Sequence, residues 1–286
     1  MMSLLNPRRC LLFVPGARAD RFQKAFTSGA DQICIDLEDA VSLADKATAR
    51  EATYDFIIHA PISMAELGVR INTISSALGI ADLKRLLDRG AQPAFVMLPK
   101  IESADEIMIA DKLLAGTAIP LIAQLESPRA VFEARNIAKV SRRLQALMFG
   151  GFDYAVAARV KPGRDGWLWA RGQIAAAAAE AEIGAIDVPS LDIKNLADIA
   201  AETEHVIALG FTSKAAIHPA QIEAIQNVFL PTAAENDYAN KVLDAVAYAR
   251  DAAIAVDGKL VDRPIELAAR RISQLSTLGL RQTIQG

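Results

Sequence analysis

The chain has 286 residues, of which 52% are apolar and 23% charged, and its formal net charge is −3. This is the composition of an ordinary globular protein and excludes a disordered chain. The small net charge and the short apolar runs argue against a nucleic acid or a membrane as a partner.

The two cysteines, Cys10 and Cys34, lie inside apolar, strand-like runs. Buried, reduced thiols are typical of cytosolic proteins. Near the N-terminus, Arg8 and Arg9 precede a short apolar run without the cleavage pattern of a signal peptide. We therefore expect a cytoplasmic protein.

Eight short runs rich in Val, Ile, Leu and Phe recur along the first 218 residues. They do not alternate strictly with polar residues, which indicates strands that are buried on both faces. The runs cover residues 10–16, 32–39, 67–72, 94–100, 119–127, 144–153, 184–190 and 211–218.

Helix-like stretches separate these runs. Ser42 and Ser103 each begin a capping-box pattern, and Ser127 followed by Pro128 predicts an N-cap and a first helical residue. Eight strands, each followed by a helix, predict a (β/α)8 TIM barrel. An open, doubly wound sheet is the competing fold, but no GxGxxG motif follows the first strand.

The pattern changes after Pro231. Residues 232–256 predict one long amphipathic helix, residues 257–259 a turn, and the residues from Pro264 onward another helix. We therefore expect a barrel over residues 1–231 that carries the metal and substrate site. The C-terminal helical segment, residues 232–286, would cap its own barrel or pack on an adjacent subunit.

Polar side chains stand at the C-terminal ends of the predicted strands, where the active sites of barrel enzymes lie. We expect these side chains to surround a single mouth. They are Asp36, Glu38, Asp39, Arg70, Lys100, Glu126, Asp153, Asp187 and His218.

Glu126 and Asp153 form the most informative pair. They are one strand–helix unit apart, so their strands should be neighbours at about 5 Å. Two carboxylates at that spacing repel each other unless they share a proton or a cation. A hard ion such as Mg²⁺ suits one or two carboxylates, with water and substrate oxygens as its other ligands. The alternative is that both residues cap helices or pair with arginines.

Three further residues at the mouth each have two interpretations. Arg70 could clamp a substrate carboxylate or form a salt bridge to Glu38 or Asp39. Lys100 could form a Schiff base with a carbonyl substrate or a structural ion pair. His218 could support another group or act as a general base.

The same residues carry a family resemblance, because their motifs occur in a characteristic order. The motifs lie at residues 9–16, 36–41, 69–72, 98–100, 126–128, 149–153, 216–219 and 257–262. In this order they resemble citrate lyase β-subunit-like proteins of the HpcH/HpaI aldolase/citrate lyase superfamily, which includes relatives that act on malyl-CoA and citramalyl-CoA. The resemblance covers residues 8–275.

The resemblance implies a (β/α)8 barrel, often in a homotrimer or another homo-oligomer, with Mg²⁺ held at Glu126 and Asp153. It implies that Arg70 contacts substrate oxygens near the metal. Three further carboxylates receive roles from it. Glu38 and Asp39 would lie in the surrounding shell of water and ligand, and Asp262 would act as acid or base from a neighbouring chain.

The resemblance also implies a coenzyme A thioester as substrate. Arg18, Lys24 and Lys46 fall where relatives place groups near the coenzyme A phosphates. Backbone N–H groups around Gly150 and Gly151 could join Arg70 in stabilising developing negative charge.

The activity that the resemblance implies is a Mg²⁺-dependent carbon–carbon lyase reaction. A 3-hydroxyacyl-CoA thioester such as citramalyl-, malyl- or citryl-CoA would give a 2-oxo acid and acetyl-CoA. The alternatives are a metal-dependent aldolase on free 2-oxo acids, a Schiff-base aldolase through Lys100, and a β subunit that works only in a citrate lyase complex with an acyl-carrier partner.

Overall fold

The computed structural model describes residues 8–248 and 254–285. They fall into two compact units that divide between Ile225 and Gln226. Among the described helices, none combines the length and the apolar composition that crossing a bilayer requires.

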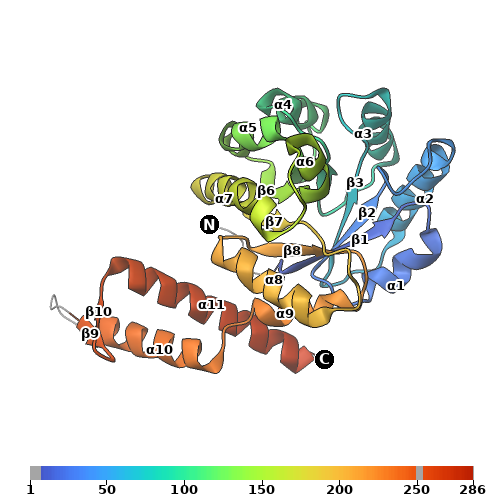
Figure 1. The fold of residues 1–286 in the computed structure, drawn as a ribbon. Coiled ribbons are helices and arrows are strands. Elements are labelled where there is room, and N and C mark those ends of the chain that lie inside the picture. The colour runs from blue at the N-terminus through green and yellow to red at the C-terminus, as the bar shows by residue number, and fades with distance from the viewer. Residues whose placement is uncertain (1–7, 249–253, 286) are drawn as a thin grey trace. The chain divides into compact units, whose positions relative to one another are not determined.

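The first unit contains a closed barrel of eight parallel strands, in which each strand pairs with the next and β8 pairs with β1 (Figure 1). The predicted (β/α)8 barrel is thereby confirmed. The strands are β1 (Cys10–Pro15), β2 (Gln32–Asp36), β3 (Glu66–Arg70), β4 (Val96–Leu98), β5 (Leu121–Leu125), β6 (Leu144–Phe149), β7 (Gly184–Asp187) and β8 (Ser213–Ala216).

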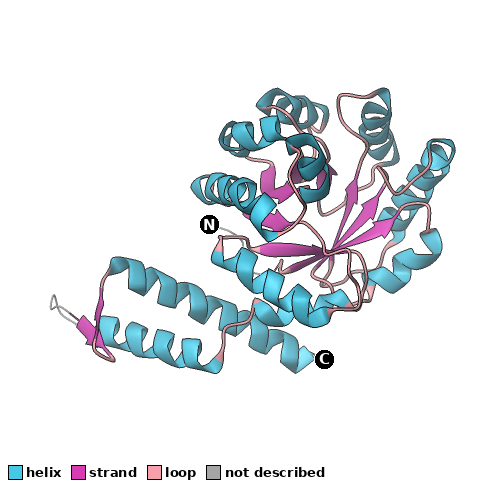
Figure 2. Ribbon diagram, in the orientation of Figure 1, coloured by secondary structure: helices cyan, strands magenta, loops and turns pink. Residues whose placement is uncertain are grey.

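Helices follow the strands and surround the barrel (Figure 2). They are α1 (Phe22–Phe26), α2 (Lys46–His59), α3 (Ala77–Arg89), α4 (Ala104–Leu113), α5 (Pro128–Lys139), α6 (Gly151–Ala158), α7 (Arg164–Glu180), α8 (Leu196–Ala208) and α9 (Gln221–Val228).

The predicted helix starts are confirmed at two of three positions. Ser103 forms the capping box of α4, and the Ser127 side chain accepts a hydrogen bond from Ala130 N, with Pro128 in the first turn of α5. The capping box at Ser42 is wrong. A short 3₁₀ turn (Leu43–Asp45) stands between Ser42 and α2, and the Ser42 hydroxyl donates directly to the Asp45 carboxylate at 2.6 Å.

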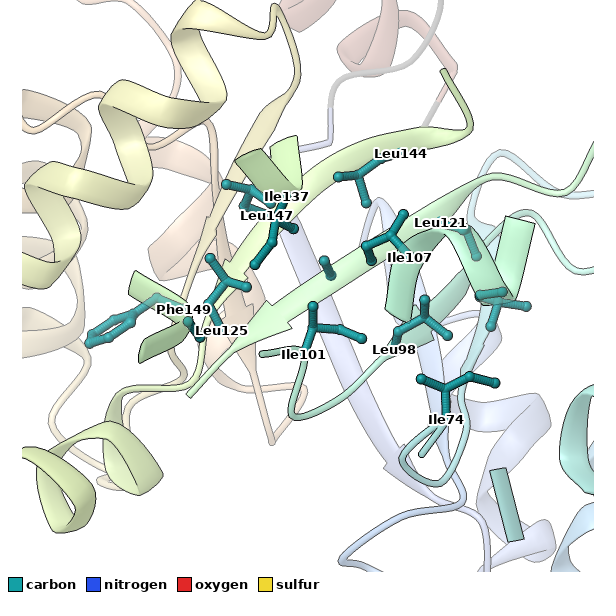
Figure 3. Packing of buried hydrophobic residues seen from close by; sticks show 14 of the residues in the cluster. Ile74, Leu98, Ile101, Ile107, Leu121, Leu125, Ile137, Leu144, Leu147 and Phe149 are labelled. Carbon is teal, nitrogen blue, oxygen red and sulfur yellow. The ribbon is translucent and has the colours of Figure 1, made fainter. Parts of the chain in front are cut away.

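Two layers of apolar side chains hold the barrel together. The outer layer lies between strands and helices, where Leu121 and Leu125 of β5 lie near Leu144 and Leu147 of β6 (Figure 3). The inner layer fills the barrel. It comprises the buried residues Leu11, Cys34, Phe95, Met97, Ile122, Ala146, Met148, Ile186 and Ala215.

Side chains at two-residue steps along a strand face the same side, and toward the C-terminal ends of the strands the inward-facing side chains become polar. Ile122 lies in the inner apolar cluster, so Gln124 and Glu126, at two-residue steps along the same strand and just beyond it, face the same way. On β2 the step runs from Cys34 to Asp36. The barrel is therefore apolar inside and carries polar side chains at the C-terminal ends of its strands.

The second unit has its own small core. It contains α10 (Ala233–Tyr248), a hairpin of β9 (Ile254–Val256) and β10 (Lys259–Val261), and α11 (Arg263–Gln285). The buried residues are Ala239, Val242, Val256, Val261 and Ala269.

The predicted helix over residues 232–256 is wrong at its C-terminal end. The described helix is α10, Ala233–Tyr248, and residues 254–256 pair with β10 as a strand, because the Asp257-Gly258 turn closes a hairpin. The helix predicted from Pro264 onward is confirmed as α11. That this unit packs on an adjacent subunit stays a prediction.

Candidate active site at the carboxyl ends of the strands

Glu126 is a buried carboxylate with an unsatisfied oxygen. It directly follows β5, and only 4% of the residue is exposed. Its Oε1 accepts a long hydrogen bond of 3.4 Å from Lys100 N, while its Oε2 is buried without a hydrogen-bond partner. A carboxylate oxygen in this position is costly unless a cation or a proton meets it.

Asp153 brings a second carboxyl group against Glu126. It lies in the first turn of α6 rather than at the end of β6, where the sequence placed it, because the strand ends at Phe149. Burial, together with the neighbouring carboxyl groups of Asp153 and Glu38, raises the pKa of Glu126 to about 9. The two predicted ligands therefore meet, and their mutual repulsion is what a bound cation would relieve.

The donor set of this pair fits a hard divalent cation. Carboxylate oxygens are ligands that Mg²⁺ takes, and Mg²⁺ usually keeps several waters beside one or two protein carboxylates. In residues 8–248 and 254–285, no group of three or more His, Cys, Asp and Glu side chains is arranged to hold a metal. Substrate and water oxygens would therefore supply the other ligands.

Arg70, the last residue of β3, is held rigidly inside the mouth. Its Nε and Nη2 donate to the two oxygens of Asp36 at 2.8 and 2.7 Å, and its Nη1 donates to Gln124 at 3.2 Å. Nη1 also lies 3.1 Å from Oε2 of Glu38. Burial lowers the pKa of Arg70, but its bonds to Asp36 outweigh burial and raise that pKa. A fixed guanidinium of this kind can bind an anion without reorganising.

The sequence analysis predicted a role for Arg70 but none for Asp36 and Gln124, the two residues that accept its hydrogen bonds. Asp36 belongs to the polar end of β2, and Gln124 is a polar residue in an otherwise apolar strand. Polarity inside a buried strand is the signal that could have identified them, because a buried polar group needs a partner.

The turn after β2 presents two carboxylates to the mouth. Asp36 shapes this turn, because its oxygens accept hydrogen bonds from the backbone N–H groups of Glu38 and Ala40 at 2.9 and 3.3 Å. Glu38 is buried, which raises its pKa although Arg70 and Lys100 oppose the rise. Asp39, next in the chain, is exposed.

Lys46 supports the same turn from α2. Its Nζ donates to the carbonyl oxygens of Leu37 and Glu38 at 2.7 and 2.5 Å. The structure therefore places this ammonium on the backbone that carries Glu38. Its predicted role near the coenzyme A phosphates stays a prediction.

Lys100 reaches the turn from beyond β4. Its Nζ donates to Glu38 Oε1 and to both oxygens of Asp39, at 3.2 and 3.1 Å for the latter. Partial burial lowers the pKa of Lys100, but the bonds to Glu38 and Asp39 outweigh burial and raise it. A Schiff base requires a neutral amine, so this arrangement favours the ion-pair interpretation.

Gly150 lets Glu126 approach α6. A Cβ at position 150 would collide with Cγ of Glu126, so a side chain there would displace the carboxylate. The N–H of Gly150 donates to the Leu125 carbonyl at 2.9 Å and is therefore committed to β5. Gly151 begins α6, where first-turn N–H groups lack intrahelical partners and favour negative charge.

Several predicted residues lie apart from this group. Arg18 is exposed and pairs with Asp20 at 2.7 Å, and Lys24 is exposed on α1. His218 is exposed just beyond β8, where its Nδ1 accepts from Ala220 N at 3.2 Å. None of these contacts joins them to Glu126.

Asp187 and Asp262 have other partners. Both oxygens of Asp187 accept hydrogen bonds from Arg171 of α7 at 2.8 and 2.9 Å, and Lys214 of β8 donates to one of them at 2.7 Å. Asp187 is therefore part of a buried ion cluster with a helix. Asp262 belongs to the second unit, is exposed, and accepts from Ile265 N at 3.2 Å at the start of α11.

Comparison with known proteins finds relatives of this chain along most of its length. The family model HpcH/HpaI aldolase/citrate lyase matches residues 9–219. The citrate lyase subunit beta of Escherichia coli K12 is 34% identical over 290 residues, which cover 96% of this chain and 95% of that protein. The L-malyl-CoA/beta-methylmalyl-CoA lyase of Cereibacter sphaeroides is 30% identical and covers 95% of this chain and 96% of that protein.

A solved structure shows the same fold with ligands. The protein CitE from Mycobacterium tuberculosis, in complex with magnesium, acetoacetate and coenzyme A, superposes with a TM-score of 0.81 at 30% sequence identity. The match covers 96% of this chain and 99% of that one.

Proposed function

The chain belongs to the HpcH/HpaI aldolase/citrate lyase family, and we propose that it is a Mg²⁺-dependent carbon–carbon lyase acting on a coenzyme A thioester. The substrate would be a 3-hydroxyacyl-CoA such as citramalyl-, malyl- or citryl-CoA, and the products a 2-oxo acid and acetyl-CoA. The observation that carries this proposal is the meeting of Glu126 with Asp153 around an unsatisfied, buried carboxylate oxygen. The relative crystallised with magnesium and coenzyme A supports both ligands.

Glu126 and Asp153 would hold the metal, which supplies a Lewis acid for the substrate oxygen that becomes the keto group. Arg70 binds the negative charge of the substrate's carboxylate and of the hydroxyl oxygen, whose proton passes to solvent water as the bond breaks. Because Asp36 and Gln124 fix the guanidinium in advance, Arg70 stabilises this charge without moving.

Breaking the carbon–carbon bond leaves the enolate of the acetyl thioester, which needs a proton on its terminal carbon. We assign that proton to Asp262, supplied by an adjacent subunit of a homotrimer or another homo-oligomer. Glu38 and Asp39 lie on the turn beside Arg70 and Lys100 and accept hydrogen bonds from substrate and water. In the reverse direction the same groups would form the bond, since each step is reversible.

The test incubates the purified protein with Mg²⁺ and each of malyl-, citramalyl- and citryl-CoA, and measures the 2-oxo acid and acetyl-CoA released. We expect one thioester to be cleaved and EDTA to abolish cleavage. Asp153→Ala should be inactive, whereas the matched control Asp165→Ala, an exposed aspartate in the first turn of α7, should retain activity.

Two results would replace this proposal. Cleavage of a free hydroxy acid without coenzyme A would indicate an aldolase for free 2-oxo acids. A protein that is inert alone but active with an acyl-carrier partner would indicate a subunit of a lyase complex, which the name of the Escherichia coli relative favours as the second candidate.

A further inference from the structure

Lys100 stands just beyond β4 in a backbone conformation that lysine rarely adopts. Its φ is +54°, in the left-handed region that is unfavourable for a residue with a Cβ. Glycine would adopt this conformation freely, so a lysine at this position indicates that its side chain is needed. The conformation directs the Lys100 N–H toward Glu126 Oε1, while its side chain reaches the turn after β2.

The Lys100 ammonium lies within a shell of carboxylate oxygens. Three oxygens accept from it, one from Glu38 and two from Asp39, and 40% of the side chain is exposed to solvent. A shell of carboxylate oxygens that is open to water on one side is also what a hard divalent cation binds. The ammonium therefore stands where such an ion would find ligands.

The ion pairs at the mouth divide its carboxylates into two sets. The first set is compensated by the protein's own cations and comprises Asp36 and Glu38 with Arg70, and Glu38 and Asp39 with Lys100. The second set is Glu126 and Asp153. In the described part of the chain, no lysine or arginine forms an ion pair with either of them, although Glu126 has a buried oxygen without a partner.

We propose that the Lys100 ammonium is a built-in cation that takes the place of a second divalent ion and limits the site to the single ion at Glu126 and Asp153. One residue touches both sets of carboxylates, through its backbone N–H and its Nζ. This inference rests on the proposed function in that it takes Glu126 and Asp153 as ligands of the single ion.

The test counts bound metal rather than turnover. Wild-type protein and Lys100→Ala are each titrated with Mn²⁺, and bound ions per chain are measured by calorimetry and electron paramagnetic resonance. We expect one ion in the wild type and two in Lys100→Ala.

Two further variants separate charge from side-chain loss. Lys100→Arg keeps the positive charge and should bind the same number of ions as the wild type. Lys100→Met retains most of the aliphatic stem and should also bind one ion more than the wild type. It replaces Lys100→Ala in the test if Lys100→Ala does not fold. The matched control is Lys139→Ala, because Lys139 also pairs with a carboxylate, Glu180, and is 43% exposed. It should bind as many ions as the wild type.

The outcomes keep this inference apart from the proposed function. Equal numbers of ions in the wild type, Lys100→Ala and Lys100→Met overturn the role of Lys100, whatever that number is. An additional ion in Lys100→Ala or Lys100→Met, absent in Lys100→Arg, supports it. Asp153→Ala that still binds one ion and cleaves the thioester would instead overturn the proposed metal site.

Discussion

Glu126→Gln should stabilise the metal-free protein and abolish its stabilisation by Mg²⁺. Glutamine has nearly the shape of glutamate, can accept the hydrogen bond from Lys100 N, and can donate to Asp153. The substitution therefore removes the titratable group with little change in packing. What it removes is the free-energy cost of protonating, on folding, a buried carboxyl group that is ionised in the unfolded chain.

The size of the effect follows from the pKa of Glu126. Its pKa is about 9 in the folded protein and 4.5 as the ordinary value, so the folded state binds a proton more tightly. The stabilising contribution of that proton is complete below pH 4.5 and is lost as pH rises toward 9. At pH 7.5, about three pH units above the ordinary value, the loss is about 4 kcal/mol at about 1.4 kcal/mol per unit.

The measurement is urea denaturation in EDTA between pH 5 and 9, followed by tryptophan fluorescence. Both tryptophans, Trp167 and Trp169, lie on α7 and therefore report on the barrel unit. We expect the free energy of unfolding of the wild type to fall with pH relative to Glu126→Gln. Glu223→Gln, an exposed glutamate on α9, serves as the control and should follow the wild type.

Adding Mg²⁺ should narrow the difference in stability between the two proteins at pH 8. A ligand at a hundred times its dissociation constant stabilises the folded state by about 2.7 kcal/mol, and only the wild type should gain this. Parallel pH profiles in EDTA, or a Glu126→Gln protein that is less stable than the wild type at pH 8 without metal, would refute the reasoning.

Four further results are expected. Asp153→Ala should lose both Mg²⁺ binding and turnover, measured by calorimetry and by 2-oxo acid release; an active variant would contradict the metal assignment. Asp262→Asn should bind Mg²⁺ normally but react at least about a hundredfold more slowly, the usual scale for a general acid or base; a near-normal rate would show that this aspartate is structural. Asp36→Asn should cost about 3–5 kcal/mol in urea denaturation, because it breaks the buried pair with Arg70; a loss below about 1 kcal/mol would show that the pair is dispensable. Borohydride reduction with pyruvate should leave the mass of the chain unchanged, because Lys100 is held as an ammonium; a trapped adduct would restore the Schiff-base mechanism.

The sequence by itself was sufficient to predict the barrel. Strands that are buried on both faces appear in the sequence as continuous apolar runs, and each of the eight predicted runs overlaps one strand of the closed sheet. It also brought Glu126, Asp153 and Arg70 into one group, because residues at the ends of successive parallel strands must meet at one end of a barrel. The caps at Ser103 and Ser127 were predictable for a different reason, because their hydrogen-bond partners lie within a few residues along the chain.

The sequence pattern did not predict where one element ends and the next begins. Apolar continuity extended the predicted sixth run to Asp153, although the chain leaves the strand at Phe149 and begins α6 at Gly151. The amphipathic pattern of residues 232–256 likewise did not separate the end of α10 from a strand that needs β10 as its partner.

Only the tertiary structure decided which cation meets which carboxylate. Arg70 binds Asp36, 34 residues away, and Lys100 binds Asp39 at a separation of 61. Asp187 accepts a hydrogen bond from Arg171, although its position at the end of β7 predicted that it would lie at the mouth of the barrel. The partner of each charged side chain depends on distances across the closed sheet and on burial, because electrostatic attraction acts through space. The order of residues along the chain gives neither the distances nor the burial.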